Sequence, residues 1–263
     1  MCGIFGVVAR DTVDITEPQL TGLVDELFRL SDSRGKEASG WAVRTERGLT
    51  VFKQPTSGTH LSRMPQSRQL FHDAIHAEAQ TRDAAIATAT DAVQLPLALI
   101  GHSRLVTNGR QTLNSNNQPV IRDGYVGVHN GIVVNVDQLW HQCPQTQPTT
   151  EVDTEIILHL LHEHMTHQPD VETALARTFD DIEGTASIAL LSDVIDRMIL
   201  ASNNGSLYLA QAGRDQPLFF ASERYILERL LRHRLVRSRD VDYAIEQIGT
   251  DQACIVDFAG DHA

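Results

Sequence analysis

The chain has 263 residues, of which 41% are hydrophobic and 21% charged, which is typical of a globular protein able to bury a substantial core. Its 34 acidic residues outnumber 22 basic ones, and the formal net charge of −12 argues against unspecific binding to nucleic acid or anionic membranes. No apolar stretch reaches the roughly 18–20 residues of a membrane span, and the start lacks the features of a secretory signal. The cysteines have neither metal-like nor disulfide-like spacing, so we expect a reducing, cytoplasmic setting; they are Cys2, Cys143 and Cys254.

The first part of the chain opens with an apolar, β-branched segment that predicts a strand over residues 2–10. Thr16 and Pro18 are typical of a helix N-terminus, and the apolar spacing after them predicts an amphipathic helix as far as Leu30. Two strands and an alanine-rich stretch that favours a helix come next, over 40–45, 49–54 and 66–92.

Two apolar runs then lead directly into polar segments. Residues 95–100 precede Gly101-His102-Ser103-Arg104, and residues 125–129 precede Asn130-Gly131. We expect both polar segments to lie at strand ends, where binding groups are commonly placed.

The remainder of the chain groups its strands together instead of alternating them with helices. Two helices, four short strands, one helix and a last pair of strands are predicted in turn, over 153–167, 171–182, 184–192, 197–202, 206–211, 217–221, 223–234 and 243–258. Such runs favour an α+β layered architecture over a doubly wound one. Because no repeat, linker or boundary is evident, a single domain over 2–263 is the simplest expectation.

Cys2 directly follows the initiator methionine. If Met1 is removed, the chain begins with a residue that carries both a thiol and a free α-amino group. The thiolate is a strong nucleophile, and an α-amino group with a pKa near ~7.7–8.0 suits a general base close to neutral pH. Position alone leaves another interpretation open, in which Cys2 is a small hydrophobic residue that starts an edge strand.

Four segments, taken in order, resemble one family. They are Cys2-Gly3-Ile4-Phe5-Gly6, GHSRLVTNG at 101–109, VHNGIVVNVDQL at 128–139 and VDTEIILHLL at 152–161. Together they resemble the glutaminase domain of class II glutamine amidotransferases, in particular that of glucosamine-fructose-6-phosphate aminotransferases. Residues 33–43 and 184–191 extend the resemblance, which is weak over 60–94 and after about 204. The resemblance implies an N-terminal-nucleophile hydrolase with a four-layer αββα sandwich of two antiparallel sheets flanked by helices.

The resemblance also implies catalytic roles. Cys2 would attack the side-chain amide of glutamine to give a thioester and ammonia, with its own α-amino group relaying the proton. The side chain of Asn130 and the backbone N–H of Gly131 would donate to the negative oxygen of the tetrahedral intermediate. Asn-Gly between two apolar runs is also the strongest short signal for a plain β-hairpin turn, and both interpretations can hold together.

A second group of residues would bind the amino-acid part of glutamine. By resemblance, the guanidinium of Arg104 holds the α-carboxylate and Asp153 holds the α-ammonium. From sequence alone, Arg104 could equally be a surface arginine and Asp153 a helix N-cap. The resemblance further places three residues along the glutamine pocket and a fourth near the nucleophile; these are Thr107, Asn108, Gly109 and Arg34.

Histidines gather on the predicted helix at 153–167. They are His159, His162, His164 and His167, and some of their spacings could bring two imidazoles to one face. The run His162-Glu163-His164 lacks the four-residue histidine spacing of metalloproteases, so a solvated helix face is the favoured interpretation. We therefore expect no metal site and no cofactor.

Three functional hypotheses remain open. The chain could be a glutaminase that supplies ammonia to a separate synthase subunit, because the sequence has no room for a synthase domain and no P-loop. It could instead be a free-standing amidohydrolase of glutamine or a γ-glutamyl amide. A non-catalytic glutamine-binding regulatory protein is the third. The ligand expected in each case is L-glutamine or a close analogue, and a homo-oligomer is an alternative to a synthase partner.

Overall fold

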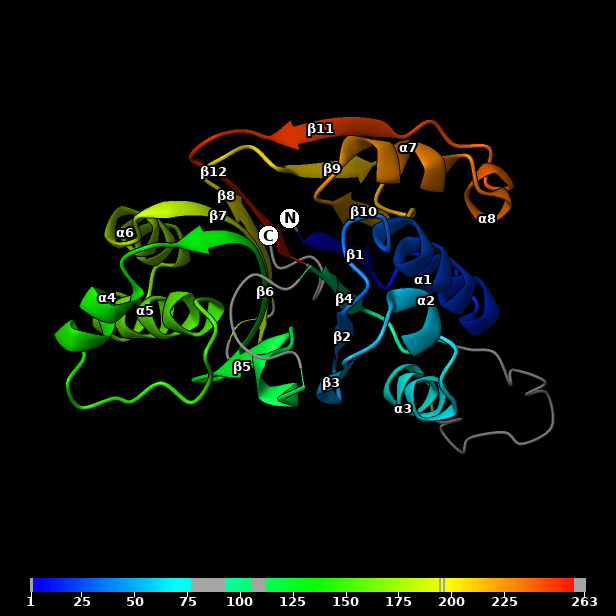
Figure 1. The fold of residues 1–263 in the computed structure, drawn as a ribbon. Coiled ribbons are helices and arrows are strands. Elements are labelled where there is room, and N and C mark those ends of the chain that lie inside the picture. Colours follow the sequence, from blue (N-terminus) through cyan, green and yellow to red (C-terminus); the bar gives the residue numbers. More distant parts are fainter. Residues whose placement is uncertain (1, 77–92, 106–111, 194, 196, 258–263) are drawn as a thin grey trace.

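A computed structural model describes residues 2–76, 93–105, 112–193, 195 and 197–257. Its strands form two antiparallel sheets that lie face to face, and helices cover both outer faces (Figure 1). This is the α+β, four-layer αββα architecture that the sequence predicts. None of the helices in the described ranges has the length and apolar character needed to cross a membrane.

The first sheet has seven strands in the order β11-β9-β10-β1-β4-β2-β3. In that order they span Ala244–Ile248, Leu207–Gln211, Leu218–Ala221, Gly3–Ala9, Leu97–Arg104, Ala38–Thr45 and Gly48–Gln54. Strand β1 is central and pairs with both β10 and β4, with Gly3 opposite Ser103 and Phe5 opposite Ala221. The N-terminal strand is therefore held from both sides.

The second sheet has five strands in the order β12-β8-β7-β6-β5. In that order they span Gln252–Asp257, Arg197–Ser202, Gly184–Ser192, Tyr125–Val133 and Val120–Arg122. Strands β6 and β7 pair along their full lengths, from Tyr125 opposite Ser192 to Val133 opposite Gly184. The polar segment at Asn130 thus belongs to the best-paired part of this sheet.

Helices form the two outer layers. The first sheet is covered by α1 (Glu17–Ser31), α2 (Gly58–Leu61), α3 (Pro65–Ile75) and α7 (Arg224–Leu231), with α8 (Arg234–Arg237) against α1 and α7. The second is covered by α4 (Val136–Gln142), α5 (Thr154–His167) and α6 (Val171–Asp181). A short 3-10 helix, η1, spans Asn114–Asn116.

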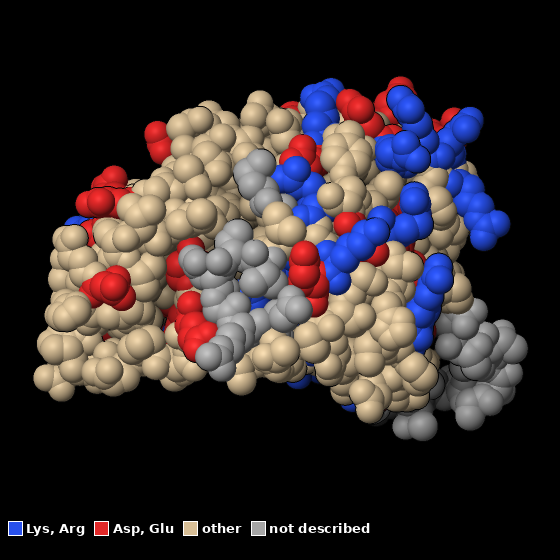
Figure 2. Space-filling model, in the orientation of Figure 1, with Lys and Arg blue, Asp and Glu red and all other residues tan. Residues whose placement is uncertain are grey.

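On the face in Figure 2, basic side chains gather around α7 and α8, whereas the half formed by α4–α6 shows mainly acidic ones.

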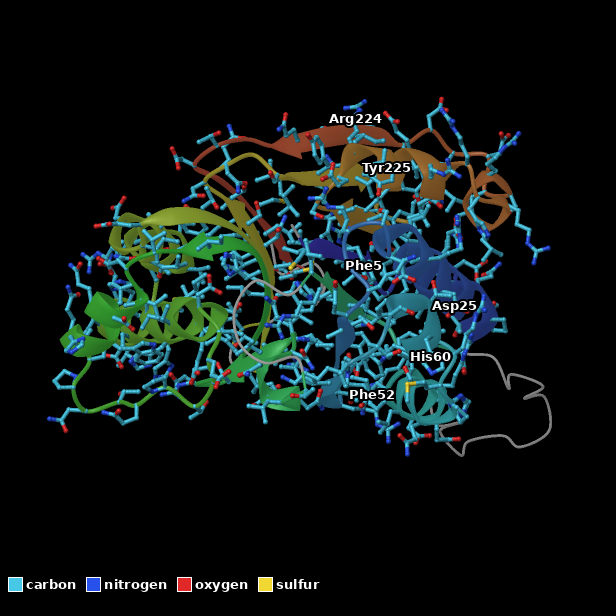
Figure 3. The ribbon with its side chains drawn as sticks, viewed as in Figure 1. Phe5, Asp25, Phe52, His60, Arg224 and Tyr225 are labelled. Carbon is cyan, nitrogen blue, oxygen red and sulfur yellow. The ribbon has the colours of Figure 1, made fainter. Side chains whose placement is uncertain are left out.

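Side-chain alternation along the strands separates three apolar cores. In β1, Phe5 and Val7 pack toward the helices of the first sheet, whereas Ile4 and Val8 pack into the space between the sheets. The ring of Phe5 lies edge-on to that of Phe28 in α1, with the ring centroids 4.8 Å apart, where β1 passes α1 (Figure 3). Residues of even number in β1 therefore face the second sheet, and this parity orients Cys2.

The N-terminus of α1 lies where Thr16 and Pro18 predicted a helix start. Pro18 lies in the first turn, and the side chain of Gln19 accepts a hydrogen bond of 2.9 Å from the backbone N–H of Thr16. Within the stretch 66–92, helix α3 accounts for residues up to Ile75, and residues 77–92 lie outside the described ranges.

One expectation about local structure is wrong, and a second holds in position but not in the bond that the side chain makes. Asn130 and Gly131 lie inside β6 and not at a strand end or in a hairpin turn, because β7 pairs with both of them and with the two residues beyond. Asp153 occupies the N-cap position of α5, but its side chain makes no capping bond. It accepts instead from the backbone N–H of Val133, at 3.0 Å, which ties α5 to β6.

Candidate active site

Strand parity brings three of the predicted site residues together between the sheets. Gly3 faces Ser103 across β1 and β4, so the next pair along places Cys2 beside Arg104, the last residue of β4. Val126 and Val128 of β6 line the core between the sheets, so Asn130, two residues further along the same face, points into this space as well. The cluster closes one end of that core.

Cys2 bridges the two sheets. Its backbone N–H donates to the side-chain oxygen Oδ1 of Asn130 at 3.0 Å, and its Sγ lies 3.5 Å from the carbonyl oxygen of Leu105. Burial raises the pKa of the Cys2 thiol above its ordinary value, although the positive charge of Arg104 acts in the opposite direction. The thiol is thus held close to a fixed amide and a guanidinium.

The oxygen and the nitrogen of the Asn130 side-chain amide have different surroundings. The residue is 3% exposed, and its side-chain oxygen accepts from the backbone N–H of Cys2. Among the described residues, its amide nitrogen has no hydrogen-bond acceptor. A bound substrate oxygen close to Cys2 would therefore find this donor available, held at a fixed orientation by the bond to the oxygen.

Gly131 can only be glycine in this backbone. It has a φ of +156°, and a Cβ at this position would lie 1.9 Å from the carbonyl oxygen of Thr185 and 2.7 Å from Nε2 of His129. Strand β7 therefore presses directly against Gly131. Any side chain here would displace the segment that carries Asn130.

Arg104 is buried, with 4% of its surface exposed, and one edge of its guanidinium is fixed. Its Nη1 donates to the backbone oxygen of Asn116 and to the side-chain oxygen of Asn117, each at 2.7 Å. Burial lowers the pKa of Arg104, an effect that the nearby Cys2 and Asp153 oppose. The arginine is a structured part of the site and not a surface residue.

Asp153 is held between β6 and α5. Besides the bond from Val133, its Oδ1 lies 3.5 Å from Nδ1 of His129. Burial would raise the pKa of this carboxyl group, but His129 and the backbone donor outweigh burial and bring the pKa below its ordinary value of 3.8. Asp153 is therefore a fixed negative charge whose field reaches both Cys2 and Arg104.

The other predicted site residues divide into two groups. The guanidinium of Arg34 pairs with Glu223 at 2.8 Å, and its Cβ lies 3.2 Å from where a Cβ on Gly3 would be. Arg34 thus supports the start of β1, next to Cys2. Three residues expected along the glutamine pocket lie outside the described ranges, namely Thr107, Asn108 and Gly109.

Sequence reasoning missed the polar residues that support Arg104. Lys53 donates to the backbone oxygens of Asn117 and Pro119, at 2.6 and 2.8 Å, and burial together with Arg104 lowers its pKa to about 8. Asn116 binds Glu151 through two bonds of 2.8 and 3.0 Å. The run Asn114-Ser115-Asn116-Asn117-Gln118 was the available signal, because so many amides between two strands need partners once the segment is buried.

Gln118 and His102 form a second, deeper part of this network. The side-chain amide of Gln118 donates to the backbone oxygen of His129 at 3.1 Å and accepts from its N–H at 2.5 Å, which fixes the β6 backbone just before Asn130. His102 lies completely buried on β4, and burial lowers its pKa to about 3, so the imidazole is neutral. The part of the network formed by Gln118 and His102 is therefore uncharged at neutral pH.

Comparison with known proteins gives the family. Residues 102–229 match the family model described as a glutamine amidotransferase domain. The chain is 26% identical over 262 residues to the isomerizing glutamine–fructose-6-phosphate aminotransferase of Pseudomonas putida, covering 99% of this chain and 37% of that protein. The enzyme of the same name from Xanthomonas campestris is 30% identical over 226 residues, covering 85% of this chain and 32% of that protein.

The chain contains a class II glutamine amidotransferase domain. Members of this class are enzymes with an N-terminal cysteine nucleophile, and Cys2 stands at that position. The solved glutamine phosphoribosylpyrophosphate amidotransferase of Bacillus subtilis has the same fold, with a TM-score of 0.65 at 19% identity over 99% of this chain and 50% of that one. The chain spans about a third of the length of these curated relatives.

The histidine face of α5 is only partly as expected. His159 is buried, not solvated: its Nδ1 lies 2.7 Å from Oδ2 of Asp123, and its ring stacks on Trp140 with centroids 5.3 Å apart. His164 lies near the surface and pairs with Asp181 at 2.7 Å. These two histidines have separate carboxylate partners and serve packing and surface pairing respectively.

Proposed function

We propose that this amidotransferase hydrolyses the side-chain amide of L-glutamine through a thioester on Cys2 and releases ammonia for use by a separate synthase. The observation that carries the proposal is the 3.0 Å bond between the backbone nitrogen of Cys2 and Oδ1 of Asn130. Once Met1 is removed, that nitrogen is the α-amino group, and the same contact would orient it beside its own thiol. A nucleophile, a base and an oxyanion donor then meet at one point.

The steps follow from this arrangement. The α-amino group takes the thiol proton, and Sγ of Cys2 bonds to the amide carbon of glutamine. The negative oxygen of the tetrahedral intermediate accepts from the amide nitrogen of Asn130 and the N–H of Gly131. As the carbon–nitrogen bond breaks, the α-ammonium returns the proton to the leaving amine, so ammonia is formed. Water, activated by the same amine, then cleaves the thioester to glutamate and restores the thiol.

Substrate recognition falls to the fixed charges on either side. Arg104 is held in place by Asn116 and Asn117, and its guanidinium would bind the α-carboxylate of glutamine. Asp153 has a pKa below its ordinary range and so stays ionised at neutral pH to hold the α-ammonium. We further propose that residues 2–263 act as one glutaminase domain, with Thr107, Asn108 and Gly109 along its pocket and Arg34 supporting the nucleophile.

A glutaminase assay tests the proposal. Protein whose intact mass shows loss of Met1 should release glutamate and ammonia from glutamine, and the Cys2→Ala variant should release neither. Cys254→Ala is the matched control, because that thiol is also free and half-buried but lies on β12, and it should leave the rate unchanged. Activity that survives Cys2→Ala would overturn the mechanism, whereas fast turnover without any partner would favour a free-standing amidohydrolase over an ammonia donor.

A further inference from the structure

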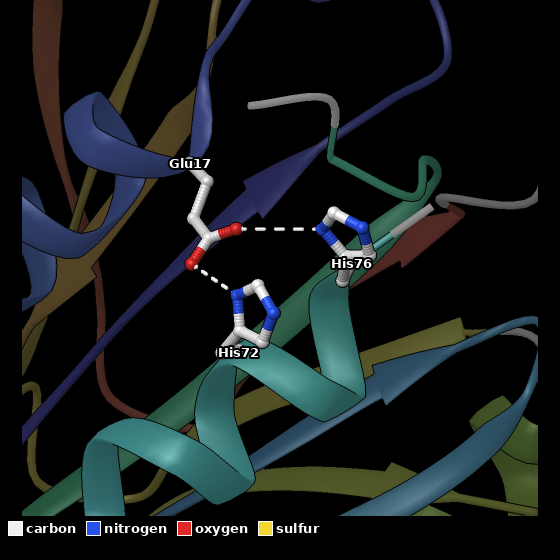
Figure 4. Close-up of side chains that lie close together, drawn as sticks. All are labelled: Glu17, His72 and His76. Carbon is white, nitrogen blue, oxygen red and sulfur yellow. Dashed lines mark hydrogen bonds and ion pairs between the residues drawn. The ribbon is translucent and has the colours of Figure 1, made fainter. Parts of the chain in front are cut away.

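Glu17, His72 and His76 form a cluster on the helix side of the first sheet (Figure 4). Oε1 of Glu17 lies 2.7 Å from Nδ1 of His72, and Oε2 lies 3.7 Å from Nδ1 of His76. The two imidazoles come from successive turns of the α3 end, with ring centroids 4.7 Å apart. Each residue can offer one ligand atom such that all three atoms lie within 4.8 Å of one another.

The residue types and spacing suit a transition-metal ion. Histidines four apart on a helix present two nitrogens to one point, and a carboxylate from elsewhere in the chain can complete a three-ligand set. A tetrahedral zinc ion, with ligand bonds of about 2.0–2.2 Å, holds its ligand atoms roughly 3.3–3.6 Å apart. The separations of 2.7 and 3.7 Å lie on either side of that range. The third separation, between the two imidazoles, is at most 4.8 Å, so side-chain rotations would have to bring these two rings closer for all three atoms to surround the ion.

Partial exposure leaves room for an ion to enter. The side chains of Glu17, His72 and His76 are 19%, 40% and 31% exposed. Nδ1 of His76 itself is buried and lacks a hydrogen-bond partner, so this atom is the one that would gain most from a metal ligand. Of the neighbouring cations, Arg68 is neutralised by Asp25 at 2.6 Å, and Arg47 donates to the backbone oxygen of His76.

We propose that Glu17, His72 and His76 bind a divalent transition-metal ion of the zinc class, with water in the fourth position. The site lies far from Cys2, because Glu17 begins α1 and Ser31, at its other end, packs beside Gly3; the helix between them is about 21 Å long. The ion would join the end of α3 to the start of α1, and its role is structural, not catalytic. Asp73, which follows His72, accepts from Gln69 at 2.8 Å and adds no ligand to the site.

Zinc titration of metal-stripped protein tests the site. The full chain carries alanine in place of Cys2, Cys143 and Cys254, because each of these free thiols would itself bind zinc, and the Cys2→Ala change makes the result independent of glutaminase activity. Calorimetry should show one site, and His76→Ala and Glu17→Gln should each weaken it by at least about tenfold. His164→Ala is the matched control: its imidazole also lies 2.7 Å from a carboxylate, that of Asp181, but within the described part of the chain no second imidazole joins the pair. It should leave the affinity unchanged.

A second readout separates binding from misfolding. Zinc should raise the unfolding temperature of the cysteine-free parent and of its His164→Ala control, and should raise it much less in the His76→Ala and Glu17→Gln variants, each compared with its own metal-free form. Cobalt in place of zinc should give the absorption of a tetrahedral nitrogen–oxygen site. Equal zinc affinity in all four proteins, or no zinc binding by the parent, would overturn the proposal.

Discussion

Replacing Asn130 by alanine should reduce catalysis far more than stability. The substitution removes one hydrogen bond in the folded state, the 3.0 Å bond from the Cys2 nitrogen, and so should lower the free energy of unfolding by about 0.5–1.5 kcal/mol. If the amide nitrogen of Asn130 donates to the oxyanion, its loss should lower kcat by about 10²–10³-fold, or roughly 2.7–4 kcal/mol of transition-state stabilisation. KM for glutamine should change little, because the oxyanion forms only after binding.

Asn135→Ala is the matched control for this effect. Asn135 lies just beyond the end of β6, and its amide makes two bonds of 2.9 Å, to the Asp181 carbonyl and from the Glu183 N–H. Its removal should destabilise the fold at least as much as Asn130→Ala, yet leave kcat near that of the parent. Glutamate release gives kcat and KM, and urea denaturation gives stability. A kcat for Asn130→Ala within about threefold of the Asn135→Ala value would refute the oxyanion role.

Three further predictions concern the neighbouring residues. Gly131→Ala should lower kcat and destabilise the fold by about 1–3 kcal/mol, measured by urea denaturation, because its Cβ would lie 1.9 Å from the Thr185 oxygen; unchanged stability would contradict the packing. Arg104→Lys should raise KM for glutamine by about tenfold or more with a smaller effect on kcat, because an ammonium cannot make two parallel bonds to a carboxylate; an unaltered KM in steady-state assays would exclude the clamp. Asp153, with a lowered pKa, contributes stability that is complete above its unfolded pKa near 3.8 and is lost as pH falls through its folded pKa. Asp153→Asn should therefore lose less stability than the parent on acidification from neutral pH to about pH 3, and parallel acid profiles would contradict this.

Local sequence signals predicted many of the helices and strands, and the family resemblance predicted the four-layer sandwich. The apolar run at Gly3–Ala9, the capped amphipathic helix after Thr16 and the closely spaced strands from Gly184 onward all have local signals, and each lies where expected. The position of Asn130 and Gly131 was predicted wrongly for a physical reason. Asn-Gly favours a turn locally, but pairing with β7 over nine residues overrides this preference and keeps both residues in the strand.

The supporting residues of the site could not be predicted because their contacts are not local. Lys53 reaches backbone oxygens more than 60 residues away, at Asn117 and Pro119, and neither end of these bonds has a sequence signature. The same holds for Glu17 and His72, which are 55 residues apart and meet only because α3 packs near the start of α1. The sequence drew attention instead to the histidines of α5 as possible metal ligands, because they are close together in the sequence. In the structure one of them, His159, is buried and packs on Trp140.

Intact-mass analysis of Met1-processed protein after exposure to the diazoketone analogue of glutamine tests the central claim most directly. We predict a single covalent adduct that peptide mapping assigns to Cys2, that excess glutamine suppresses and that Cys2→Ala abolishes. Absence of any adduct on the processed chain, or an adduct that maps to Cys143 or Cys254 instead, would contradict the assignment of Cys2 as the nucleophile of a glutamine site.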